Sequence, residues 1–237
     1  MMEFMTAAFW VAVGQIILID ILLGGDNAVV IALACRGLPP KQRKLGIIYG
    51  TAGAIVLRVI LIVFALTLLA IPYLKLVGGL LLIWIGVKLL LPQHDEDEHG
   101  NIQSSDKLWS AVKTVIVADL VMSVDNVIAI AGAAQGAGEG HQVPLVIFGL
   151  LVSIPIIVAG SQIVLKLMDR FPVIITLGGM LLGWIAGEMM FTDPGIAPHV
   201  AGFDPKLKYA AAVAGALLVL VIGKVFAARQ RKDAAAS

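Results

Sequence analysis

Charged residues and cysteine are scarce in this chain of 237 residues. Only 14% of the residues are charged and 59% are apolar, with a mean hydropathy of +0.98. A soluble domain carries about 25% charged and about 45–50% apolar residues. The single cysteine, Cys35, excludes a disulfide scaffold and any site that needs two thiolates. The composition therefore predicts a protein that crosses the membrane several times.

Other features that the sequence lacks exclude further classes of protein. The sequence has no Gly-x4-Gly-Lys-Ser/Thr loop, so nothing in it indicates ATP use. The net charge of +1, without a basic face, gives no reason to expect a nucleic-acid partner. The alternating hydrophobicity of a transmembrane β-barrel is missing, which favours an all-α fold. We expect a protein that is not an enzyme and has no resident cofactor.

Seven stretches are long and apolar enough to cross a bilayer as helices, which takes about 20 residues each. Lys and Arg concentrate in loops on the cytoplasmic side. If the N-terminus lies outside, thirteen Lys and Arg fall inside and only Lys75, Lys206 and Lys208 outside. We therefore expect a multi-pass protein of the cell membrane, of bacterial inner-membrane type, with an outer N-terminus and a cytoplasmic C-terminus. The predicted spans are 8–34, 45–71, 73–91, 109–134, 143–167, 172–191 and 208–227.

Two parts of the chain repeat each other. A shift of 99 residues aligns Trp10–Cys35 with Trp109–Ala134 and gives ten identities. The pattern Gly-Gly-x-Leu-Leu-x-Trp-Ile starts at Gly78 and again at Gly178. Each unit has three spans, so the second unit must cross the membrane in the opposite sense to the first. Inverted repeats of this kind are typical of secondary transporters, whose substrate site lies where the repeats meet.

This repeat sets the expected organisation of the chain. We expect a first three-helix repeat, an acidic cytoplasmic linker that contains His, a second and inverted three-helix repeat, and an outer loop with a seventh helix and a basic tail. The linker could collect cations, although acidic runs in loops are usually only solvated. These four parts cover residues 1–92, 93–107, 108–192 and 193–237.

Four aspartates fall in the middle of predicted spans. A carboxylate at the centre of a membrane helix costs about 2.5–3.5 kcal/mol, so such acids normally face a cavity or a partner and mark ion or proton paths. On an ideal helix the second acid of each pair points about 120° away from the first. A bend is needed if all four are to converge, and Gly24-Gly25 could supply it in the first span. The four acids are Asp20, Asp26, Asp119 and Asp125.

The acids belong to a larger set of candidate metal ligands. Carboxylate and amide oxygens suit Mg²⁺, Ca²⁺ or Mn²⁺. Met122 and Ser123 share a helix face with Asp119, and the Met122 thioether favours a transition ion such as Mn²⁺, although simple packing explains this methionine equally well. The predicted metal-ligating residues are Asp20, Asp26, Asn27, Asp119, Met122, Ser123, Asp125 and Asn126.

The two Asp-x5-Asp-Asn segments and the repeated Gly-Gly-x-Leu-Leu-x-Trp-Ile pattern resemble the TerC family of integral membrane proteins, over about residues 8–191. This family is named for tellurium resistance and is grouped with LysE-like transporters, and several members are implicated in Mn²⁺ export. The resemblance implies a metal-ion transporter and does not settle which metal it moves. Together with the candidate ligands, it leads us to expect an exporter of divalent metal cations, Mn²⁺ foremost. It places the functional acids at Asp20, Asp26, Asp119 and Asp125.

We expect alternating access at the aspartates with proton exchange, because acids that share a site repel one another and hold protons that a metal would expel. A LysE-like exporter of a cationic amino acid or another small solute fits the same carboxylates. An intramembrane aspartyl protease with an Asp26–Asp125 dyad is the enzyme alternative, but Leu23 stands where its Gly-x-Gly-Asp pattern needs glycine. The expected partners are lipid, a divalent cation and protons, and a homo-oligomer stays open.

Three further charged residues lie inside predicted spans. Arg58 needs a carboxylate partner there, either as a structural counter-ion or as a gate. Lys88 and Glu188 occupy equivalent positions of the two units with opposite charge, and snorkelling toward the membrane surface explains both.

Overall fold

The computed structural model describes residues 7–69, 71–91, 104–135, 142–200 and 202–236. In these ranges the chain forms helices joined by turns, without strands, so the all-α prediction is confirmed. The acidic stretch 93–99 and the side chain of Asp125 lie outside what the structure describes. The helices are α1 (Ala7–Leu23), α2 (Gly25–Cys35), α3 (Pro40–Leu69), α4 (Leu74–Leu90), α5 (Ser104–Gln135), α6 (Gln142–Arg170), α7 (Val173–Phe191), α8 (Ala197–Val200) and α9 (Leu207–Ala236).

Local sequence explains where these helices begin and end. Pro40 is the first residue of α3, a position at which its missing N–H costs nothing. Gly24 separates α1 from α2, and the two helices are bent by 50°. A Cβ atom at Gly24 would lie 2.2 Å from the carbonyl oxygen of Asp20, so only glycine fits this break. The expected bend in the first span is therefore present at the expected glycine.

Four helices are long and apolar enough to cross a membrane in the described part of the chain, and the bent pair of α1 and α2 makes a fifth candidate. They correspond to the predicted first, second, fifth, sixth and seventh spans. Helix α4 has only 17 residues, and the side chains of the last turns of α5 are not described. The full count of seven spans therefore stays a prediction.

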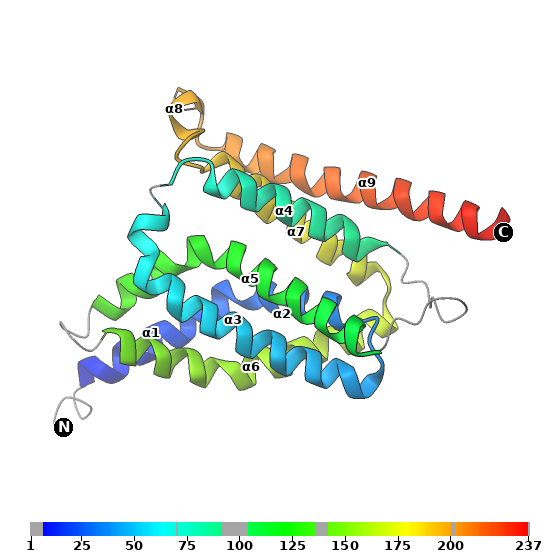
Figure 1. Ribbon diagram of the computed structural model, residues 1–237. Helices are drawn as coiled ribbons and strands as arrows, with labels where there is room; N and C mark the ends of the chain where they lie inside the picture. The colour runs from blue at the N-terminus through cyan, green and yellow to red at the C-terminus, as the bar shows by residue number, and fades with distance from the viewer. Residues whose placement is uncertain (1–6, 70, 92–103, 136–141, 201, 237) are drawn as a thin grey trace.

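The helices form two layers (Figure 1). One layer contains α4, α7 and α9, and the other contains α1, α2, α3, α5 and α6. Successive long helices run in alternating directions, so that α4 and α7, the last helices of the two predicted units, are antiparallel. Packing is reciprocal: α3 lies on α5, α6 lies on α1 and α2, and α4 lies on α7. An inverted repeat predicts this pattern of directions and contacts.

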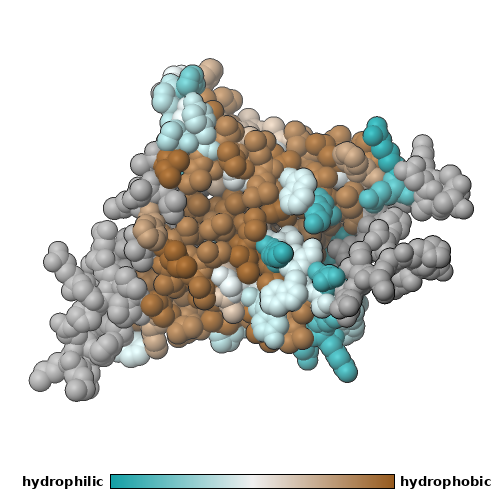
Figure 2. Space-filling model, in the orientation of Figure 1, coloured by the Kyte–Doolittle hydropathy of each residue, from teal (hydrophilic) through white to brown (hydrophobic). Residues whose placement is uncertain are grey.

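Small residues bring the helices of the α4/α7/α9 layer into close contact. A Cβ atom at Gly183 of α7 would lie 2.3 Å from the carbonyl oxygen of Gly215 in α9. Gly78 of α4 packs on Val121 of α5, which joins the two layers. On the face shown in Figure 2, the middle of the molecule is mainly apolar, and most hydrophilic residues lie toward its two ends. This distribution suits a bundle that lies across a lipid bilayer.

Candidate functional site

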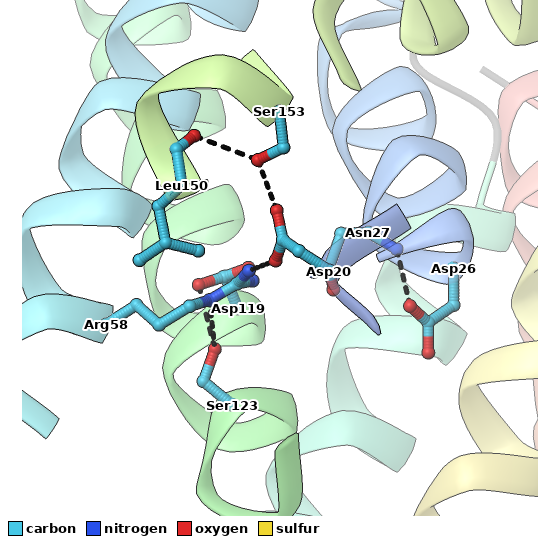
Figure 3. Close-up of polar contacts among 8 residues, drawn as sticks. All are labelled: Asp20, Asp26, Asn27, Arg58, Asp119, Ser123, Leu150 and Ser153. Atoms are coloured by element: carbon cyan, nitrogen blue, oxygen red, sulfur yellow. Dashed lines mark hydrogen bonds and ion pairs between the residues drawn. The ribbon is translucent and has the colours of Figure 1, made fainter. Parts of the chain in front are cut away.

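The buried centre of the five-helix layer holds one arginine between two of the predicted acids (Figure 3). The side chain of Arg58 comes from α3, and it is 3% exposed. Its Nη1 atom pairs with Oδ1 of Asp20 from α1, and its Nη2 atom lies 2.5 Å from Oδ1 of Asp119 from α5. The expected carboxylate partner of Arg58 is therefore confirmed, and it is a pair of acids rather than one.

Two serine hydroxyls complete this buried cluster, which we call the Arg58 cluster and which consists of Arg58, Asp20, Asp119, Ser123 and Ser153. The Nε atom of Arg58 donates to Ser123 Oγ at 3.1 Å, and this hydroxyl donates to Asp119 Oδ2 at 3.0 Å. Ser153 Oγ contacts Asp20 Oδ2 and lies 2.8 Å from the carbonyl oxygen of Leu150. Its single proton can serve only one of these acceptors at a time.

The charges of the Arg58 cluster do not balance one another completely. One guanidinium can balance only one of two carboxylates, and all three side chains are almost fully buried. Removing one partner of a buried, hydrogen-bonded ion pair leaves an uncompensated charge, which typically costs about 3–5 kcal/mol. The guanidinium thus occupies the position between these acids at which a bound cation would be expected.

A cavity of about 410 Å³ lies where the two layers meet, and it contains three of the other predicted residues. We call it the interlayer cavity. The five-helix layer contributes Asp26, Met122 and Asn126. Helix α4 contributes Lys75, and α7 with the turn after it contributes Ile185, Glu188, Met189 and Thr192. Carboxylate, amide, hydroxyl and thioether groups therefore line one space.

The first residues of α2 place Asp26 and Asn27 just after the break at Gly24. Asp26 Oδ1 accepts a hydrogen bond from the backbone N–H of Asn27 at 2.8 Å. The amide group of Asn27 is 3% exposed, and neither its oxygen nor its nitrogen has a hydrogen-bond partner in the described structure. Such a group normally costs about 1–3 kcal/mol, so it is a candidate ligand that awaits a partner.

The predicted ligands therefore fall into two groups in this structure. Asp20, Asp119 and Ser123 belong to the Arg58 cluster, whereas Asp26, Met122 and Asn126 line the interlayer cavity. Among the described residues, no three His, Cys, Asp or Glu side chains converge as a metal site. Because the Asp125 side chain is not described, convergence of the four aspartates stays a prediction.

The contribution of α7 to the cavity was not predicted from the sequence. Glu188 lines the interlayer cavity, and its Oε1 atom lies 3.2 Å from Nζ of Lys208. The ammonium group of its repeat counterpart Lys88 lies 5.2 Å from the centre of the Trp84 ring. The opposite charges at these two positions are the sequence signal that sets Glu188 apart.

Comparison with known proteins identifies the family of the chain. The model of the integral membrane protein TerC family matches residues 5–232. The chain belongs to the TerC family. It is 44% identical over 183 residues to the membrane protein YjbE of Bacillus subtilis, covering 77% of this chain and 80% of YjbE.

More distant TerC relatives include YceF of Bacillus subtilis, which is 28% identical over 76% of this chain and 70% of its own length. The inner membrane protein YgdQ of Escherichia coli K12 is 28% identical over 53% of this chain and 60% of its own length. No solved structure matches the chain. This TerC protein is therefore an integral membrane protein with several membrane-crossing helices.

Proposed function

We propose that this TerC protein exports divalent metal cations, Mn²⁺ foremost, by alternating access at its intramembrane aspartates. The observation that carries the proposal is the interlayer cavity, because Asp26, Met122 and Asn126 were predicted as ligands from the sequence and line the same space. Oxygen ligands hold hard divalent cations, and the thioethers of Met122 and Met189 favour Mn²⁺ over Mg²⁺ or Ca²⁺.

The position of the cavity supports a transport mechanism. Its ligands come from both layers, so rocking of the α4/α7/α9 layer against the other layer would open and close it. Inverted repeats supply two related conformations in which such a site faces opposite sides. The break at Gly24 gives α2 the freedom to move its acid relative to α1.

In this mechanism, Arg58 acts as an internal counter-cation. It balances Asp20 and Asp119 while no cargo is present, so the empty protein does not carry two bare buried carboxylates through its conformational change. Cargo that reaches these acids must displace the guanidinium. We assign proton exchange to Asp26, because it has no contact with Arg58 among the described hydrogen bonds and ion pairs.

Energetics require some form of coupling for export. Moving a divalent cation outward against an inside-negative potential costs about 4.6 kcal/mol per 100 mV. The sequence has no phosphate-binding loop for ATP. Counter-transport of protons is the source of free energy that fits a site made of carboxylates.

Transport by the purified protein in lipid vesicles tests the proposal. We expect Mn²⁺ flux that depends on a pH gradient and falls at least tenfold in Asp26→Asn and Asp125→Asn. Asp204→Asn is the matched control, because Asp204 lies exposed in the loop before α9. Equal flux in all variants, or flux without dependence on the pH gradient, would contradict the corresponding part of the proposal.

A cationic amino acid is the second candidate cargo. The cavity of about 410 Å³ is larger than a bare ion needs, and Lys75 lines it beside Asp26 and Glu188, so it could accept a molecule that carries both charges. Lysine or arginine that competes with Mn²⁺ in the same vesicles would favour this cargo. Absence of competition would favour the metal.

A further inference from the structure

A second cavity, of about 720 Å³, lies at the end of the bundle where α9 ends. We call it the terminal cavity. It is formed by the end of α4, the start of α7 and residues 223–228 of α9, next to the residue that follows α2. Its apolar lining includes Leu90, Ile175 and Ala227, and Gly223 and Ala228 leave it open by having small or no side chains. None of the predicted metal ligands lines it.

Two cations stand at this cavity, and no acid lines it among the residues that the structure describes. Arg36 is held in place because its Nη2 atom donates to the carbonyl oxygen of Leu91 at 3.1 Å. Lys224 extends from α9 and makes no ion pair in the described part of the chain. Asp169, an acid at the same end of the bundle, already pairs with Arg43 at 3.0 Å. The cavity therefore presents two positive charges above an apolar wall.

The helices beside the cavity are those that face lipid. Val173 and Leu177 of α7, and Val221 and Val225 of α9, are exposed on the outside of the bundle. In a membrane these side chains would contact acyl chains, so lipid lies beside the two helices that form most of the terminal cavity. A ligand in the terminal cavity would have two cations beside one end and apolar groups along the rest of its length.

We propose that the terminal cavity binds one anionic phospholipid. Its phosphate lies between Arg36 and Lys224, and one acyl chain follows the apolar wall between α7 and α9. Basic pockets between membrane helices recognise anionic headgroups in this way. A bound lipid would join α2, α4, α7 and α9, and therefore the two layers whose relative movement we propose for transport.

Native mass spectrometry of the full-length protein, released from vesicles that contain equal amounts of phosphatidylglycerol and phosphatidylcholine, tests the site. We expect one retained phosphatidylglycerol and about a 30-fold loss of its apparent affinity in the Arg36→Gln, Lys224→Gln double variant, which corresponds to about 1 kcal/mol per cation. The matched control is Lys44→Gln, Arg229→Gln, which removes two exposed basic residues that do not line the cavity.

A steric variant separates a lipid from a free anion. Ala227→Phe fills the apolar wall without a change of charge, so it should expel phosphatidylglycerol as well. Unchanged binding in this variant, competition by inorganic phosphate, or equal retention of phosphatidylcholine would each overturn the proposal. Thermal unfolding of each variant shows that the loss is not a loss of fold.

The acidic stretch 93–99 is the alternative occupant that belongs to this chain. If it fills the cavity, the unmodified protein retains no phosphatidylglycerol, and a variant with Asp95, Glu96, Asp97 and Glu98 changed to their amides does retain it. That outcome would overturn the lipid as the native occupant. None of these readouts requires metal transport, so failure here is distinct from failure of the proposed function.

Discussion

The segments 20–27 and 119–126 carry the same Asp, Asp and Asn at equivalent positions, yet they have different backbones. The first is broken between α1 and α2 at Gly24, whereas the second is part of the continuous helix α5. Ser123 stands where the first segment has Gly24, and its hydroxyl bonds to both Asp119 and Arg58. The bent segment therefore has glycine at the position where the continuous helix has a hydrogen-bonded serine.

The two segments also share one cation, the guanidinium of Arg58, which comes from the first unit. Arg58 of α3 binds both Asp20 and Asp119, while the residue 100 positions later in the second unit is Val158. Related acids therefore converge on an unrelated partner. The two acids occupy equivalent positions of the sequence repeat, whereas the cation that balances them has no counterpart 100 positions later.

Removal of Arg58, the cation that Asp20 and Asp119 share, should have the largest effect on stability. In Arg58→Gln two buried carboxylates lose their partner, so we expect a loss of about 3–5 kcal/mol in stability, measured by thermal unfolding in detergent. Arg43→Gln is the control, because the pair of Arg43 with Asp169 is partly exposed and worth less than about 1 kcal/mol.

Transport by the same variant tests whether Arg58 is more than structural. We expect net Mn²⁺ flux to fall while exchange of Mn²⁺ across the vesicle membrane continues, since the cargo itself balances the acids during exchange. Asp119→Asn in the Arg58→Gln background should restore net flux. Equal loss of both fluxes in a folded variant would assign Arg58 a structural role only.

Substitution at the break tests the difference between the two segments directly. Gly24→Ala places a Cβ atom 2.2 Å from the Asp20 carbonyl oxygen, so we expect about 1–3 kcal/mol of destabilisation and a loss of Mn²⁺ flux. The neighbouring Gly25→Ala is the control, because nothing lies within 4 Å of its added Cβ. Equal effects of the two substitutions would show that the break does not depend on Gly24.

Sequence reasoning could find these features because each has a local cause. A glycine pair in a helical segment marks a break, and an arginine inside an apolar span needs an acid. The sequence could not say which acids bind Arg58, since Asp20 and Asp119 lie 38 and 61 positions away. The place of Glu188 at the interlayer cavity depends on how α7 packs against α4 and α9, which no local pattern encodes.

A polar contact between the ends of the two units was missed for the same reason. Asp193, in the turn after α7, accepts backbone hydrogen bonds from Tyr73, Lys75 and Leu76 at the start of α4 and from Gly195, at 2.6–3.1 Å. The residue that caps α4 thus lies about 120 positions away in sequence. The start of α7, by contrast, has no side-chain cap from Pro172.

The hydrogen bonds to Asp193 distinguish the start of α4 from the start of α7. Burial alone would raise the pKa of Asp193, but the four N–H donors outweigh it and hold the pKa below its usual value. Its contribution to stability is therefore complete above about pH 4 and is lost as the pH falls through the lowered value. We expect Asp193→Asn to cost about 1–2 kcal/mol at pH 7 and to flatten this acid dependence in thermal unfolding. The control Asp204→Asn should do neither.

The smallest expected effect concerns the metal preference of the second segment. Met122 corresponds to Leu23 in the first segment, so only the second segment places a thioether beside its acids. Met122→Leu keeps the volume but removes the soft ligand, and we expect the ratio of Mn²⁺ to Mg²⁺ flux to fall severalfold with little change in stability. Met168→Leu is the control, because Met168 is buried in α6 and does not line the interlayer cavity. If the ratio of Mn²⁺ to Mg²⁺ flux does not change in Met122→Leu, this methionine only fills space in the packed interior. Selectivity for the metal would then come from the oxygen ligands.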